Sequence, residues 1–180
     1  MDELERLAFV GRSREGDPEA FGMLVADLTP GLRRYCRSFF ENWQDTDDAV
    51  QEVWIKAWKN LHTLKANGAF KTWIFRMARN VCLDRVRSAQ NRVRVVDAEE
   101  FSGQPAPEHL SPEYLAVQRS EVDMAWGIVA KLPSTLKQAF VLVCLEGMTY
   151  EQAAAIANTS ESTIRGRVAR ARKAIIEAVS

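Results

Sequence analysis

Apolar side chains recur at helical spacing through nearly all of the 180-residue chain, and strand-like alternation is almost absent. The helical pattern stops once, over residues 88–112, where three prolines and a glycine interrupt it. A structureless stretch of this length is unusual inside one compact domain. We therefore expect an all-α fold of two small helical domains, residues 1–90 and 114–180, joined by a flexible linker over residues 91–113.

Start signals divide the first half into four expected helices. Asp17 can cap a helix whose first residue is proline, and Thr29, also followed by proline, predicts the restart of a second helix. A third helix is expected to begin near Thr46 or Asp47, and a fourth after Asn67 and its following glycine. After the linker, helical pattern returns from about residue 114 to the end.

The formal net charge is zero, yet the charges are strongly segregated. Residues 71–94 carry seven basic side chains and one acid, Asp84. Residues 41–52 carry five acids and no base. Such segregation indicates that different faces of the protein contact different partners.

The reactive side chains do not form a recognisable catalytic or metal-binding pattern. Cys36, Cys82 and Cys144 are far apart in sequence, and neither His62 nor His109 is near a cysteine. A structural metal site needs clustered ligands. We expect all three cysteines to be small buried apolar side chains, with redox or metal binding as the alternative. No metal, cofactor or enzymatic activity is expected.

Targeting to or through a membrane is not expected. The longest apolar run, residues 139–145, is too short to span a bilayer. Three of the first five residues are acidic, whereas a signal peptide begins with basic residues followed by an apolar stretch. The chain is expected to be cytoplasmic, without membrane insertion.

The last thirty residues carry the strongest functional signal. Thr149 and Gln152 have the spacing of a capping box, and Ser160 can cap a further helix. Asn158 between these two helices tolerates the left-handed conformation of a tight turn. The second helix then has an apolar side and a basic side. This is the layout of a DNA-reading helix-turn-helix, with a solvated amphipathic terminal helix as the alternative.

The residues of that second helix differ in their expected roles. Arg165, near its N-terminal end, is placed to read a base edge, and Arg170 can contact either a base or a phosphate. Other basic residues of the helix are expected to supply salt-dependent affinity for the DNA backbone. Gly166 and Ala169 offer no polar side-chain group, so few base contacts are expected.

Residues 45–58 (DTDDAVQEVWIKAW) and 70–87 (FKTWIFRMARNVCLDRVR) closely resemble bacterial sigma factors. More narrowly, the chain is similar to the short extracytoplasmic-function group of the sigma-70 family. Residues 16–21, 146–150 and 163–167 match further motifs of this group. The resemblance implies a protein that binds core RNA polymerase, reads the −10 and −35 elements of promoter DNA with its two domains, and acts in an envelope or environmental stress response under an anti-sigma factor.

In this family the third helix docks on the polymerase. Its face opposite the apolar stripe has an isoleucine among acids and an amide, which suits a protein-binding patch. A solvated acidic helix with one stray isoleucine is the alternative. The docking residues that the resemblance implies are Asp48, Gln51, Glu52 and Ile55.

The resemblance also assigns the DNA-contacting residues. In the family, the loop before the fourth helix captures a base flipped from the non-template strand, at a cost of a few kcal/mol for unstacking. The implied −10 contacts in this loop and on the fourth helix are His62, Lys65, Asn67, Arg76, Arg79, Asn80, Arg85 and Arg87. The implied −35 contacts are Ser162, Arg165, Gly166, Arg167, Ala169, Arg170 and Lys173.

Tryptophans on the apolar stripes are expected to be core residues. Trp54 and Trp58 follow the stripe of the third helix, and Trp73 follows that of the fourth. Stacking of Trp73 or Phe75 on single-stranded bases is the alternative.

Two other functions remain as alternatives to promoter-directed initiation. One is a sigma-mimicking decoy that binds an anti-sigma factor and never contacts DNA, although such a mimic should lose its basic faces. The other is a one-site helix-turn-helix regulator, against which the polymerase-docking helix argues. Binding to core polymerase separates this regulator from a sigma factor.

Overall fold

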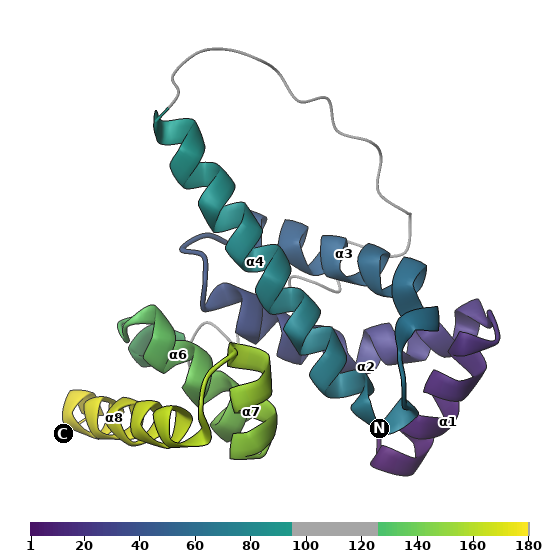
Figure 1. Cartoon of the computed structure of the whole chain (residues 1–180). Helices are drawn as coiled ribbons and strands as arrows, with labels where there is room; N and C mark the ends of the chain where they lie inside the picture. The colour runs from purple at the N-terminus through teal and green to yellow at the C-terminus, as the bar shows by residue number, and fades with distance from the viewer. Residues whose placement is uncertain (95–125, 180) are drawn as a thin grey trace.

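The computed structural model describes residues 1–94 and 126–179, and within these residues every regular element is a helix (Figure 1). This confirms the predicted all-α class and the two helical domains. The elements are α1 (Glu3–Arg14), α2 (Pro18–Arg37), α3 (Trp43–Asn60), η1 (Leu61–Thr63), η2 (Asn67–Ala69), α4 (Phe70–Arg94), α6 (Ser134–Phe140), η3 (Val141–Leu145), α7 (Tyr150–Ala157) and α8 (Glu161–Val179).

Helices α1 to α4 pack around one apolar core in the N-terminal domain. Helix α2 lies against α1, α3 and α4, and α3 also packs on α4. The fully buried side chains at the centre include Leu24, Leu32 and Tyr35 from α2 and Ile74 and Phe75 from α4. Most residues of the apolar stripes that the sequence predicts for these helices are therefore buried between them.

Helix α1 is absent from the sequence-based expectations, although a local signal for it exists. The Asp2 carboxylate accepts the backbone N–H of Glu5 at 2.8 Å, and the Glu5 carboxylate accepts that of Asp2 at 3.1 Å. This reciprocal pair is a capping box. Val10, the buried apolar residue of α1, attaches this short helix to the core.

Helix α2 is continuous, so the predicted restart at Thr29 is wrong. Pro30 lies inside the helix, where its ring removes a backbone donor and would normally bend or break it. Leu28 and Leu32 on either side are both buried in the same core. The Thr29 hydroxyl accepts a hydrogen bond from the Trp54 indole at 3.0 Å. Tertiary packing thus keeps the two halves of α2 in one line.

Helix α3 begins at Trp43, a few residues earlier than predicted. Asn42 is the N-cap, since its side-chain oxygen accepts the backbone N–H of Asp45 at 2.8 Å. Thr46, one of the predicted start residues, lies inside the helix, is buried, and donates its hydroxyl to the Asn42 carbonyl at 2.9 Å. Asparagine is as good an N-cap residue as aspartate, so Asn42 caps α3 before the acidic residues that predicted its start.

The prediction that Trp58 is a core residue is also wrong. Trp54 is buried, but Trp58 is 41% exposed and packs one side of its ring on Phe21, with ring centroids 4.9 Å apart. The two tryptophans share a stripe of α3, but Trp58 lies at the edge of that stripe, because Ala57 before it and Leu61 after it are the residues that enter the core. Trp73 is half-buried, whereas Phe75 is fully buried and is therefore not available for base stacking.

The C-terminal domain is built from α6, η3, α7 and α8. The predicted helix over residues 134–145 is α-helical only to Phe140 and continues as the π-helical η3. The side chains of Leu142, Ile156 and Ile164 fill the centre. Residues 126–129 are helical, whereas most of the helix predicted from residue 114 lies outside the described residues.

The predicted linker, residues 91–113, lies almost entirely outside the described residues. The backbone of α4 continues to Arg94. The two domains are nonetheless in contact, because α4 of the first packs against α7 of the second (Figure 1). None of the described helices is long and apolar enough to cross a membrane.

Truncation of Leu24 tests the core of the N-terminal domain. Leu24→Ala should lower the free energy of unfolding by roughly 2–5 kcal/mol, because it leaves a cavity among fully buried side chains. The neighbouring Met23 is 50% exposed, so Met23→Ala should change the free energy of unfolding by less than about 0.5 kcal/mol. Urea unfolding followed by circular dichroism measures both. Equal effects of the two substitutions would contradict this core.

Candidate nucleic-acid and polymerase interfaces

The predicted helix-turn-helix is present in α7 and α8. The Thr149 hydroxyl accepts the Gln152 backbone N–H at 3.1 Å, and the Gln152 side chain accepts that of Thr149 at 3.0 Å. Asn158 ends α7 in the left-handed region, with φ 52° and ψ 54°. The Ser160 hydroxyl then accepts the Thr163 N–H at 3.2 Å. The capping box, the turn residue and the second cap are all confirmed.

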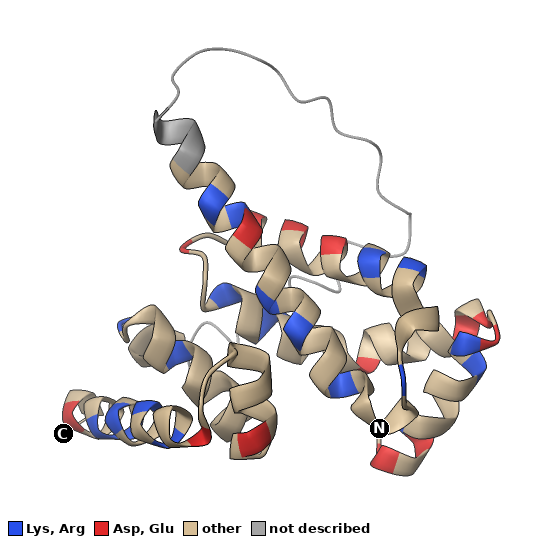
Figure 2. Cartoon of the chain, in the orientation of Figure 1, with Lys and Arg blue, Asp and Glu red and all other residues tan. Residues whose placement is uncertain are grey.

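Helix α8 has one buried side and one exposed side. Ile164, Val168 and Ala171 are buried against the rest of the C-terminal domain, as the sequence predicted. The predicted −35 residues lie on the other side, where Arg167 is half-buried and the remainder are exposed: Ser162, Arg165, Gly166, Ala169, Arg170 and Lys173. Figure 2 shows the lysines and arginines distributed along this helix.

Arg165 is held in place by two neighbours. Its guanidinium lies over the Tyr150 ring, 4.2 Å from the centroid, and 3.6 Å from a Glu161 carboxylate oxygen. A cation over an aromatic face is stabilised by the ring quadrupole. Sequence reasoning missed Tyr150, because the contact depends on how α7 and α8 pack. These neighbours restrict the arginine near the N-terminal end of α8.

The basic face of α4 is partly turned toward α3. Arg76, Asn80 and Arg87 are exposed, while Arg79 and Arg85 are half-buried. Figure 2 shows basic residues along α4 beside the acidic residues of α3. The Arg85 guanidinium donates to the Glu52 carboxylate at 2.8 Å. The structure therefore joins a predicted −10 residue to a predicted docking residue.

The exposed face of α3 combines acids with apolar side chains. Asp48 is exposed, Gln51 and Glu52 are half-buried, and Ile55 is 42% exposed. Trp58, three residues after Ile55, is exposed to a similar extent and extends the apolar part of this face. Sequence reasoning missed it, because periodicity placed it in the core.

Glu52 remains ionised at neutral pH. Burial raises the pKa of this carboxyl, but hydrogen bonds from Lys56 and Arg85 outweigh the effect and leave the pKa below its usual value. The ion-pair contribution is therefore present above the ordinary glutamate pKa and is lost as the pH falls through the lowered value. The link between α3 and α4 is maintained at physiological pH.

The loop between α3 and α4 is anchored by buried leucines at positions 61 and 64. His62 and Lys65 are exposed, while Asn67 is half-buried and accepts a hydrogen bond from Arg14 at 2.9 Å. A cavity of about 250 Å³ lies beside the loop. Of the three predicted loop contacts, only Asn67 lines it. The structure does not bring His62 and Lys65 to the same cavity.

Two of the three cysteines are buried thiols. Cys36 and Cys82 are fully buried, as expected, and the hydrogen bond between them, together with burial, raises the pKa of Cys36 well above its usual value. Cys144 is half-buried and accepts a hydrogen bond from Arg172 at 3.4 Å. Within the described residues, no group of three or more His, Cys, Asp or Glu side chains could hold a metal ion.

Comparison with known proteins agrees with this geometry. Residues 24–92 match the family model for sigma-70 region 2, and residues 124–175 match that for sigma-70 region 4. The chain is 31% identical to the ECF RNA polymerase sigma-E factor of Escherichia coli (strain K12), over 97% of this chain and 94% of the relative. It is also 31% identical to the RNA polymerase sigma-H factor of Pseudomonas aeruginosa, over 94% and 91% of the two chains.

Two solved structures share the arrangement of both domains. CnrH in complex with the cytosolic domain of CnrY superposes with a TM-score of 0.67 and 25% identity, covering 97% of each chain. The sigma factor RpoE in complex with the anti-sigma factor NepR from Bartonella quintana superposes with a TM-score of 0.65 and 25% identity, covering 88% of this chain and 96% of RpoE. Fold and surfaces define a two-domain helical transcription factor. The chain belongs to the sigma-70 family of RNA polymerase sigma factors, in its extracytoplasmic-function group.

Asn158 offers a test of the turn at a single position. Glycine adopts a positive φ freely, whereas alanine in the left-handed region costs roughly 1–2 kcal/mol. Asn158→Ala should therefore unfold more easily than Asn158→Gly by about that amount, as measured by thermal or urea unfolding. If the two variants are equally stable, the left-handed turn is not the conformation in solution.

Proposed function

We propose that this sigma factor docks on core RNA polymerase through α3, opens the −10 region with α4 and its preceding loop, and reads the −35 element with α8. The observation that carries this division is the separation of surfaces. In the N-terminal domain, the acidic and apolar face of α3 lies beside the basic face of α4. In the C-terminal domain, a second basic face lies on α8 of the helix-turn-helix.

The proposed docking surface comprises Asp48, Gln51, Glu52 and Ile55, extended by Trp58. Aromatic and aliphatic side chains supply most of the binding energy of a protein interface, and surrounding polar groups give specificity. Ile55 and Trp58 are both exposed on one helix, with Glu52 and Asp48 on their N-terminal side and Lys56 and Lys59 beside them. The partner surface is accordingly expected to be apolar, with basic groups opposite Asp48 and Glu52.

The proposed −10 surface includes exposed Arg76, Asn80 and Arg87 on α4, which can contact phosphates and an unpaired strand. Arg79 is half-buried beside them. Arg85 acts on DNA only if it leaves Glu52 or contacts a phosphate with its remaining donors. In the loop, Asn67 is the proposed contact to a flipped base, with His62 and Lys65 contacting the backbone nearby.

The proposed −35 surface is centred on Arg165, which can hydrogen-bond a guanine edge with both terminal nitrogens. Its stacking on Tyr150 reduces the rotamer freedom that binding would otherwise remove. Arg167, Arg170 and Lys173 are proposed as phosphate contacts. Exposed Ser162, Gly166 and Ala169 allow the helix backbone to approach the groove.

We also propose that the protein acts in the cytoplasm, through binding rather than catalysis, and that an anti-sigma factor controls it. The last point is supported by the two structural relatives described above, each solved with a protein bound, one of them an anti-sigma factor. An envelope or environmental stress response fits that mode of control.

Run-off transcription tests the proposed function. The purified chain with core polymerase should produce specific transcripts from promoters of its own genome, whereas core polymerase alone should not. A decoy would bind neither core polymerase nor DNA. A one-site regulator would bind DNA without binding core polymerase, so absence of transcripts with a folded, uninhibited chain would reject the proposal.

Matched variants locate the docking surface in the same assay. Ile55→Glu should abolish binding to core polymerase, because it places a charge in the apolar part of the interface. Met23→Glu makes the same change on an apolar side chain of similar exposure on α2 and should leave binding unchanged. If Ile55→Glu and Met23→Glu weaken binding to core polymerase equally, α3 is not part of the interface.

Arg165→Ala tests −35 readout. Loss of a bidentate arginine–guanine contact of about 1–3 kcal/mol should lower initiation at −35-dependent promoters roughly 5- to 150-fold. Binding to core polymerase should not change. Arg172→Ala, on the same helix but hydrogen-bonded to Cys144, is the control and should have a smaller effect. Loss of core binding in the Arg165 variant would contradict the division of labour.

A further inference from the structure

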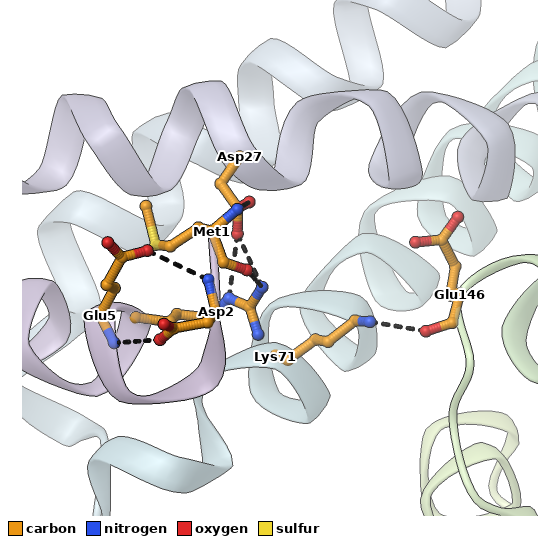
Figure 3. Close-up of polar contacts among 7 residues, drawn as sticks. Met1, Asp2, Glu5, Asp27, Lys71 and Glu146 are labelled. Atoms are coloured by element: carbon orange, nitrogen blue, oxygen red, sulfur yellow. Dashed lines mark hydrogen bonds and ion pairs between the residues drawn. The ribbon is translucent and has the colours of Figure 1, made fainter.

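The two domains are held together by more than apolar packing. The C-terminal domain meets the first through α7 against α4 and η3 against α2, with further polar contacts from Ser134 and Glu146. Across this contact the Ser134 hydroxyl donates to the Ser38 carbonyl at 3.1 Å. The Lys71 ammonium donates to the Glu146 carbonyl at 2.6 Å, and Figure 3 shows the lysine extended toward it.

Glu146 is the centre of this contact. Its side chain is only 7% exposed, although it lies in the short segment just before the helix-turn-helix. One carboxylate oxygen accepts from Arg34 Nη2 at 2.7 Å and from Arg34 Nε at 2.9 Å. Both residues that bind Glu146, Arg34 at its carboxylate and Lys71 at its backbone carbonyl, belong to the N-terminal domain. A buried carboxylate without such partners would be strongly destabilising.

Gly31 makes the approach of the two domains possible. It lies on α2, and a Cβ atom at this position would overlap the Glu146 carboxylate, lying 2.8 Å from its Cδ. Glycine is otherwise unfavourable inside a helix by about 1 kcal/mol relative to alanine. By contrast, Gly22 on the same helix has no atom within 4 Å of such a Cβ. The space at Gly31 is therefore occupied by the acid of the other domain.

The same contact borders the cavity beside the loop proposed to capture a base. The cavity beside that loop is lined on one side by Asn67, Gly68 and Lys71 of the N-terminal domain. Gly147, Met148 and Gln152 of the C-terminal domain close it on the other side. A flipped base entering this cavity would meet residues of the helix-turn-helix.

Promoter geometry requires these domains to separate. Positions −10 and −35 are about 25 base pairs apart, which is roughly 85 Å of B-DNA. A closed, compact chain of 180 residues has a radius of gyration of only about 16 Å. Domains that touch through Glu146 cannot place their basic faces on both elements at once.

We propose that Glu146, held by Arg34 and Lys71 against Gly31, is a latch that keeps the free protein closed and bounds the cavity beside the −10 loop. The closed state is a property of the chain itself; its consequence for promoter binding rests on the proposed function. Opening the latch precedes engagement of core polymerase and promoter. The fraction of open chain then sets the apparent affinity for core polymerase.

Small-angle X-ray scattering of the full chain tests the latch. A compact chain of 180 residues has a radius of gyration of about 16 Å, and opening should raise it by about 5 Å. Gly31→Glu should open the protein by clash and like-charge repulsion with Glu146. Glu146→Lys should open it independently, by repulsion from Arg34. Circular dichroism checks that both variants keep wild-type helix content.

Two controls carry the same chemical changes outside the contact. Gly22→Glu lies on α2 in open space, and Glu151→Lys replaces an exposed acid of α7. Both should stay compact. If neither opening variant expands, if the controls expand equally, or if the wild type is already extended, the latch is rejected.

Binding to core polymerase gives a second, separate readout. If the open form is about a tenth of the wild-type chain, the opening variants should bind core polymerase up to about tenfold more tightly. Expansion without tighter binding would reject the latch as a control of polymerase binding. If no form of the chain binds core polymerase, the proposed function fails while the scattering result still decides whether the latch exists.

Discussion

Helix α4 is the element on which the rest of the structure depends. One side of it buries Ile74 and Phe75 against α2, where Phe75 lies 5.6 Å from the Tyr35 ring. Burial raises the pKa of Tyr35, so this phenol is neutral at physiological pH. The same helix packs on α3 and, in the other domain, on α7. This one helix therefore contacts the helix of the proposed polymerase surface, carries the proposed −10 residues and takes part in the contact between the domains.

Acidic and basic side chains lie on separate faces of this protein, which explains how a chain of zero net charge can bind DNA. Acidic α3 and basic α4 lie side by side and are joined by the pair between Glu52 and Arg85. Such a pair contributes little to stability where it is partly exposed, but it fixes the relative position of two faces with opposite partners. Most of the residues proposed to contact the −35 element are exposed on α8.

Sequence reasoning succeeded mainly where the controlling interaction is local, although it missed the local caps of α1 at Asp2 and of α3 at Asn42. The capping box at Thr149, the left-handed Asn158 and the buried stripe of α8 involve residues within a few positions of one another, so spacing alone predicts them. It failed where packing overrides local preference. Pro30 indicates a break that the core suppresses, and Trp58 has the spacing of a core residue but lies at the edge of the buried stripe.

The sequence by itself determined the all-α class, the helix-turn-helix and the segregated charges, because each depends on residues that are close together in the chain. The sigma-70 resemblance likewise depends on short continuous segments. Only the tertiary structure decided which of those residues meet. It placed Tyr150 under Arg165, and it brought Asn67, but not His62 or Lys65, to the cavity. It also joined Arg34 to Glu146, 112 positions away in the chain. No local pattern encodes such a contact, since it depends on how two separately folded domains pack.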